Sequence, residues 1–253
     1  MKVTILGCGT SGGVPRLGNH WGACDPKNPK NRRRRVSILV EQGASRLLVD
    51  TSPDLREQLL DAGVTSLDGV LYTHDHADHT HGIDDLRPLT YMMGKKLDLY
   101  GDSVTIATLK RRFGYIFESK AGYPAIAEGH EIAPLLPPFA IGRIPVTPFR
   151  QAHGPITSLG YRFGPMAYST DLSGLDDDAF AVLEGIELWI VDALRYEPHP
   201  THAHLDLTLS WIERLKPRRA ILTHMTWDMD YDTLKRRLPA GVEPGYDGMV
   251  LEL

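Results

Sequence analysis

The sequence is poor in cysteine and in long apolar runs, and each shortage excludes a class of protein. Two cysteines, Cys8 and Cys24, are too few for a disulfide framework, and their spacing fits no zinc knuckle. The apolar run within Met1–Gly7 is too short for a signal peptide, and no run approaches the length of a membrane span. We therefore predict a cytoplasmic protein that has no membrane partner.

The sequence also lacks an excess of positive charge. It has 28 Lys and Arg against 32 Asp and Glu, for a net charge of -4, so we expect no stable nucleic-acid partner. At 253 residues and 42% hydrophobic content the chain can bury a sizeable core. No linker or shift in composition divides it, which predicts a single domain over residues 1–253. A homodimer remains open.

A cluster of potential metal ligands follows the apolar run that begins at Val70. The segment reads His74-Asp75-His76-Ala77-Asp78-His79, which is the pattern H-x-H-x-D-H. Imidazole and carboxylate groups are preferred ligands of borderline divalent metals. The alternative is a solvated polar turn, but three histidines with an interleaved aspartate make that reading weak.

Three later extended runs each end in one residue of ligand type, namely His153, Asp171 and His224. Open sheets carry functional groups just beyond their strand ends, so these residues can meet the first cluster at one rim. We predict two divalent ions, zinc or manganese, held by two ligand sets and one bridging carboxylate: His74, His76 and His153; Asp78, His79 and His224; and Asp171.

The order of these ligands resembles that of metallo-β-lactamase-fold hydrolases. The resemblance implies an α/β fold, a four-layer αββα sandwich of two mixed sheets with outer helices. Within that superfamily the chain is most similar to the phosphoribosyl cyclic phosphodiesterases of phosphonate degradation. The similarity lies in the segment Gly7–Pro15, the run Arg32–Arg35 and the sequence His204–Leu207.

The resemblance also implies roles for residues outside the two ligand sets. Asp50 corresponds to a carboxylate that orients a ligating imidazole, although a turn or a helix cap would also explain an aspartate there. His204 aligns with the non-ligand histidine of the active site, and it precedes a predicted helix whose amino terminus attracts anions. The structural zinc of the family is expected to be lost, because Cys24 stands alone and Trp227 replaces a histidine.

Three further segments have more than one interpretation. Gly7, Gly9 and Gly12 satisfy a dinucleotide-binding pattern, but Pro15 prevents the helix that such a site needs. The Arg32–Arg35 run is either a solvated face or a source of one phosphate contact. The stretch Tyr115–Glu131 is predicted to be irregular.

These residues predict hydrolysis of a small, cyclic or nucleotide-like phosphodiester by a metal-activated hydroxide that attacks phosphorus. Asp78 would orient the nucleophile, and His204 would bind phosphate or protonate the leaving oxygen. Three alternatives stay open: a ribonuclease that processes transfer RNA 3′ ends, a lactam, lactone or thioester hydrolase, and a non-enzymatic carrier in cofactor biosynthesis.

Overall fold

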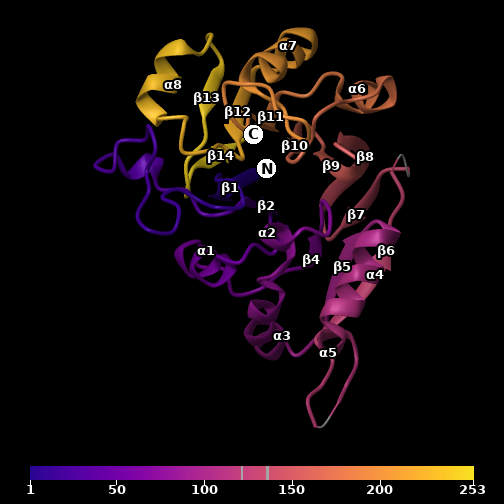
Figure 1. Ribbon diagram of the computed structural model, residues 1–253. Coiled ribbons are helices and arrows are strands. Elements are labelled where there is room, and N and C mark those ends of the chain that lie inside the picture. Colours follow the sequence, from indigo (N-terminus) through magenta and orange to yellow (C-terminus); the bar gives the residue numbers. More distant parts are fainter. Residues whose placement is uncertain (121, 135–136) are drawn as a thin grey trace.

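Two seven-stranded sheets pack face to face with helices on their outer sides (Figure 1). This architecture comes from a computed structural model that describes residues 1–120, 122–134 and 137–253. It confirms the predicted four-layer sandwich of two mixed sheets. Within the described residues, no helix has both the length and the apolarity needed to cross a membrane.

The first six strands of the sequence and the last one form one sheet, and the seven strands between them form the other. The first sheet, in the order β14-β1-β2-β3-β4-β5-β6, contains β1 (Lys2–Gly7), β2 (Ser37–Gln42), β3 (Ser45–Val49), β4 (Gly69–Leu71), β5 (Leu97–Gly101), β6 (Ala127–Glu131) and β14 (Val250–Glu252). The second, in the order β13-β12-β11-β10-β9-β8-β7, contains β7 (Phe139–Ile141), β8 (Ile144–His153), β9 (Ile156–Phe163), β10 (Met166–Ser169), β11 (Leu188–Asp192), β12 (Arg219–Thr223) and β13 (Val242–Pro244).

The helices connect strands or cover the outer faces of the sheets. Their bounds are α1 (Leu55–Asp61), α2 (Ala77–Thr80), α3 (Arg87–Met93), α4 (Ser103–Arg112), α5 (Gly114–Phe117), α6 (Asp177–Leu183), α7 (Leu205–Leu215) and α8 (Tyr231–Arg237), with short 3-10 turns η1 (Pro29–Asn31) and η2 (Ile83–Leu86). Tyr115–Glu131, predicted to be irregular, therefore contains α5 and the edge strand β6. Ala121 in that stretch lies outside the described residues.

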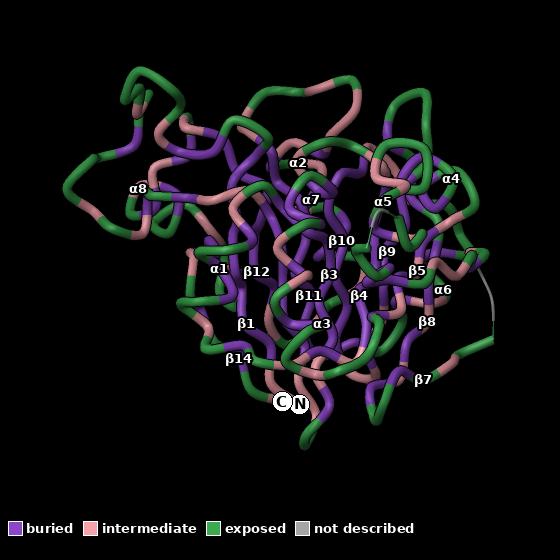
Figure 2. The backbone as a smooth tube through the Cα atoms, turned by 90° about the horizontal axis from the view of Figure 1, so that it is seen from below, coloured by how far each residue is buried: buried purple, intermediate pink, exposed green. Residues whose placement is uncertain are grey.

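Parallel pairing brings several strand ends to one rim. The strands β3 to β6 run parallel in the first sheet, and β10 to β13 run parallel in the second. Parallel strands require crossover connections, so the carboxyl ends of neighbouring strands meet at the same edge. The buried strands form the centre of the molecule, with exposed helices and loops around them (Figure 2). The strand ends at this rim are thus anchored in the buried core.

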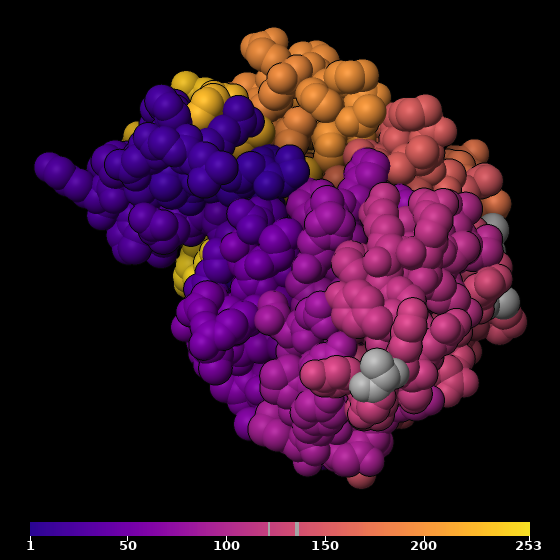
Figure 3. All heavy atoms as spheres, turned by 60° about the horizontal axis from the view of Figure 1, so that its bottom comes forward, coloured from indigo at the N-terminus to yellow at the C-terminus, as the bar shows by residue number. Residues whose placement is uncertain are grey.

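Arg33 is a structural residue of the amino-terminal segment. Its side chain is buried, and its guanidinium donates to the carbonyl oxygens of Thr226 (2.8 Å) and Met229 (2.6 Å) and lies 3.7 Å from the sulfur of Cys24. The amino-terminal segment consequently lies against the carboxyl-terminal part of the chain (Figure 3). A buried Arg33 ties together the loops around Cys24.

The rest of the arginine run has partners of its own. Its other members contact an aromatic ring or carboxylates: Arg32 faces Trp21, Arg34 pairs with Asp61 and Asp247, and Arg35 pairs with Asp54. The run is therefore engaged in holding loops and α1 rather than forming a free basic patch.

Asp247 supports this segment and makes stability depend on pH. The backbone N–H groups of Cys8 and Arg34 donate to its carboxylate at 3.1 and 2.7 Å, yet burial raises the pKa of Asp247 from 3.8 to about 6. A carboxyl with a raised folded-state pKa stabilises the fold fully below its unfolded pKa, and this stabilisation is lost as pH rises through the folded value. The loss amounts to about 3 kcal/mol for this difference in pKa.

We therefore expect Asp247→Asn to remove one component of the pH dependence of stability. The unfolding free energy of the wild type, minus that of the variant, should fall by about 3 kcal/mol between about pH 4 and pH 7. Urea unfolding across this range measures it, and Asp61→Asn, which alters an exposed carboxylate paired with the same Arg34, is the control. A difference that stays constant with pH would contradict the role of Asp247.

Candidate metal centre

Three residues of the site follow strands in a left-handed backbone conformation. Asp50 follows β3 (φ 65°), Asp171 lies just after β10 (φ 53°) and His224 follows β12 (φ 56°). Residues other than glycine rarely adopt this conformation, and it costs about 1–2 kcal/mol each. The turns redirect these side chains from the strand ends, and the surrounding packed rim maintains the strain.

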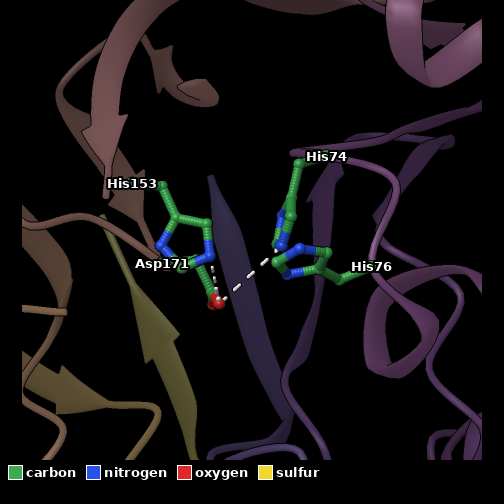
Figure 4. A group of neighbouring side chains, drawn as sticks. All are labelled: His74, His76, His153 and Asp171. Carbon is green, nitrogen blue, oxygen red and sulfur yellow. Dashed lines mark ion pairs between the residues drawn. The ribbon is translucent and has the colours of Figure 1, made fainter. Parts of the chain in front are cut away.

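The first ligand set lies between the two sheets (Figure 4). It consists of His74, His76, His153 and Asp171, whose ligand atoms all lie within 4.8 Å of one another. The Nε2 atoms of His74 and His153 are 3.8 and 3.7 Å from Asp171 Oδ2. His76 is the exposed member of an otherwise buried group, so this set opens toward solvent.

The second ligand set lies on the other side of Asp171. It consists of Asp78, His79 and His224, again within 4.8 Å of one another. The Nε2 atoms of His79 and His224 lie 3.2 and 3.4 Å from Asp171 Oδ1. Asp171 thus directs one oxygen to each set, which is the arrangement expected of a carboxylate bridging two ions. The structure brings all seven predicted ligands together.

Buried ring nitrogens show that this arrangement fits a divalent cation. The Nε2 atoms of His74, His79 and His224 are buried, and no described residue supplies a hydrogen bond to them. Buried polar atoms without partners are costly, so nitrogens that converge on carboxylate oxygens have the arrangement of ligands around a cation. The donor set of imidazoles and carboxylates suits zinc, and does not by itself exclude manganese.

Hydrogen bonds on the far side of each ring hold the imidazoles in place. His79 Nδ1 lies 2.7 Å from Asp50 Oδ2, and His153 Nδ1 lies 2.7 Å from the carbonyl of Thr201. Asp50 also accepts from the backbone and the hydroxyl of Thr73, whose oxygen is 3.0 Å from His74 Nδ1. Acceptors at Nδ1 place the proton there and leave Nε2 free to bind metal. Asp50 occupies the orienting position expected from the resemblance.

The carboxylates give the centre a strong preference for positive charge. Burial opposes ionisation of Asp171, but the charges of His224 and His79 hold the pKa of Asp171 well below its usual range. Burial also disfavours a charged His79, yet Asp171 and Asp78 raise the pKa of that imidazole well above its usual value. In the absence of metal, protons on the histidines would supply the positive charge that cations supply when bound.

A further histidine, His202, lies at this cleft, in a group with Asp171, Asp192 and His224 whose ligand atoms lie within 4.8 Å of one another and could themselves hold a metal ion. His202 lines the cleft of about 320 Å³ together with His76, Asp78 and Asp171, and its ring stacks on His224 at 4.8 Å. Its Nδ1 lies 3.1 Å from the buried carboxylate of Asp192. Among the described residues lining this cleft His204 does not appear; it is the N-cap residue of α7.

His202 thus has contacts at the cleft that His204 lacks, while the role predicted for His204 stays a prediction. His204 was favoured both by its match to the family's non-ligand histidine and by its place directly before α7, but neither shows where neighbouring side chains point. Asp192 was also missed, although the signal was present: it ends the buried strand β11, as the predicted ligands end theirs. Asp192 fixes the ring of His202 and lies 3.8 Å from His224 Nδ1.

Comparison with known proteins identifies the family. The model of the β-lactamase superfamily domain matches residues 45–225, which contain all seven ligands. The chain belongs to the β-lactamase superfamily. Its two-sheet architecture is the metallo-β-lactamase fold, and the residues gathered at the rim fit divalent metal ions.

The similar members of the superfamily carry the names of different activities. The chain is 34% identical to an octanoyltransferase of Porphyromonas gingivalis over 98% of its own length but 51% of that protein, so it spans about half of this relative. It is 30% identical over 143 residues to a ribonuclease Z of Bradyrhizobium, covering 53% of this chain and 46% of that one. A crystallised diphosphatase of the PhnP family shares 38% identity with a TM-score of 0.92, covering 100% of this chain and 97% of that one.

Proposed function

We propose that this hydrolase cleaves a small phosphoric ester, a cyclic or nucleotide-like phosphodiester or a related diphosphate. The observation that carries the proposal is the division of Asp171 between two ligand sets, 3.2 Å from His79 on one side and 3.7 Å from His153 on the other. Two-cation centres of this kind serve phosphoryl transfer because they clamp both the attacking and the leaving oxygen. The likeness to a PhnP-family diphosphatase supports phosphorus rather than a carbonyl as the reacting centre.

Different residues of the chain would have separate roles in this reaction. When bound, two divalent ions supply Lewis acidity toward phosphoryl oxygens and lower the pKa of water. Asp78, at the first turn of α2, lines the cleft and can accept a hydrogen bond from the attacking water. In its protonated form, His202 can donate from Nδ1 to Asp192 and from Nε2 to a phosphate or leaving oxygen. Ser11 and Thr201 line the remaining wall.

A panel of substrates tests the reaction class. We expect the protein loaded with zinc or manganese to hydrolyse bis(nitrophenyl) phosphate, cyclic nucleotides or a dinucleoside diphosphate with a higher kcat/KM than any lactam, lactone or thioester. Precursor transfer RNA belongs in the same panel, because part of the chain is similar to a ribonuclease Z. Faster turnover of a lactam would overturn the proposal, and faster cleavage of the RNA would favour the ribonuclease.

A further inference from the structure

A second and larger cavity adjoins the metal centre. It has a volume of about 730 Å³ and shares Pro155 and Ile156, at the turn between β8 and β9, with the metal cleft. The ligand His74 also lines it. Pockets of this size hold small organic molecules, and a phosphorus atom at the ligand sets would leave the rest of a substrate next to this cavity.

Every cation at this cavity already has a carboxylate partner. Arg150, the one cationic residue among the described residues that line it, lies 2.9 Å from Asp176. Arg112 donates to the backbone carbonyl of Asp75, another residue of the lining, and lies 3.9 Å from the Asp75 carboxylate. A second phosphate group at this cavity would therefore have to compete with Asp176 for Arg150, in a pair that is itself exposed to solvent.

Asp102 adds negative charge to the same wall. Its Oδ1 accepts from the backbone N–H of Thr105 at 2.7 Å and so caps α4, and no described cation pairs with it. A carboxylate accepts hydrogen bonds from hydroxyl groups but repels phosphate. Beside it, Val104 and Ile156 are 65% and 39% exposed and supply apolar surface. This combination suits a sugar or nucleoside, which offers hydroxyl groups and flat apolar faces without charge.

We propose that this cavity binds the uncharged, hydroxyl-bearing part of the substrate, such as the sugar of a nucleoside, and selects against a second phosphate there. The inference rests on the proposed phosphoric ester hydrolysis. It separates this chain from the phosphoribosyl substrates that its resemblance implies, because a phosphoribosyl group brings a second phosphate.

Two matched substrates test the selection. One is a nitrophenyl ester of a nucleoside monophosphate, and the other is the same ester with an added phosphate on the free sugar hydroxyl. The reacting group and the leaving group are identical, so the ratio of the two kcat/KM values reports on the distal group alone. We expect the wild type to prefer the ester with the free sugar hydroxyl by about tenfold or more, as expected when the alternative places a phosphate dianion beside unpaired carboxylate charge.

Substitution of the cavity carboxylates should reduce this preference. Asp102→Asn and Asp176→Asn each retain a side-chain oxygen that can cap their helix, as Asp102 caps α4 and Asp176 caps α6. We expect the ratio to fall about five- to tenfold in Asp102→Asn and further in the double variant, in which Arg150 is also released. Asp177→Asn, beside Asp176 but 96% exposed, should leave the ratio unchanged.

Binding of products gives an independent readout. Calorimetric titration with the nucleoside monophosphate and with the corresponding bisphosphate should show the same preference and the same change in the variants. A wild type that hydrolyses both esters but prefers the doubly phosphorylated one, or a ratio unaffected by Asp102→Asn and by the double variant, would overturn the cavity assignment alone. Absence of turnover with either ester would overturn the proposed function as well.

Discussion

Asp171→Asn should lose at least one of two bound metals per chain and about three powers of ten in kcat/KM. Asparagine has nearly the same shape and tolerates the left-handed backbone at this position, where φ is 53°. Its amide offers one oxygen and one NH₂ group, so it cannot face both ligand sets with an acceptor. The expected loss corresponds to several kcal/mol of charge stabilisation in the transition state.

Elemental analysis after dialysis and turnover of bis(nitrophenyl) phosphate measure the two effects separately. Asp177→Asn is the matched control, because it makes the same change at an exposed aspartate on α6. The bridging role would be wrong if Asp171→Asn kept two metals and the full rate. A variant that kept two metals but lost the rate would assign Asp171 to chemistry rather than to binding metal.

His202→Ala should lower the rate by about two to four powers of ten on substrates that leave as an alcohol. Its imidazole is oriented by Asp192 at 3.1 Å and lines the cleft, so removing it deletes a donor to the leaving oxygen. A nitrophenolate is a good leaving group that needs little protonation, and its release should therefore be affected much less. A role in binding phosphate alone would produce similar losses for both substrates.

His204→Ala provides the comparison, since it removes the histidine that the sequence favoured. We expect a change of less than about threefold in the rate, because the side chain of His204 makes no capping hydrogen bond at the start of α7 and is not among the described residues that line the cleft. Metal content should stay at the wild-type level in both variants. If His204→Ala shows the large loss and His202→Ala does not, the original assignment to His204 is restored.

The sequence predicted those strands and helices whose pattern of apolar residues matches the surface that they bury. The extended runs predicted before His153, Asp171 and His224 are the strands β8, β10 and β12, and the helix predicted after His204 is α7, because buried strands are apolar runs and α7 has one apolar face. Strand β6 was missed, since this edge strand, Ala127–Glu131, buries only Ala127 and is held by backbone pairing with β5. The helix α8 was missed too, although Asp230 is a capping residue in the sequence.

In the site, the sequence predicted the ligands at strand ends but not the direction of side chains in loops. Ligand residues at strand ends could be recognised because a polar residue that closes an apolar run is conspicuous, and topology then brings such ends together. The direction of a side chain in a loop carries no comparable signal. His199, His202 and His204 look alike in sequence, and only packing around Ala203 and Asp192 places His202 at the cleft.

Because each ligand set takes residues from both sheets, metal binding would also affect the stability of the fold. Each set combines residues from positions 74–79, after β4, with residues from the second sheet at His153, Asp171 or His224. A bound ion would therefore act as a cross-link that closes a long loop of chain, as a disulfide does in secreted domains. Cys8 and Cys24 are both free thiols, so in this protein a chelator would have the effect on the fold that a reducing agent has on a disulfide-bonded one.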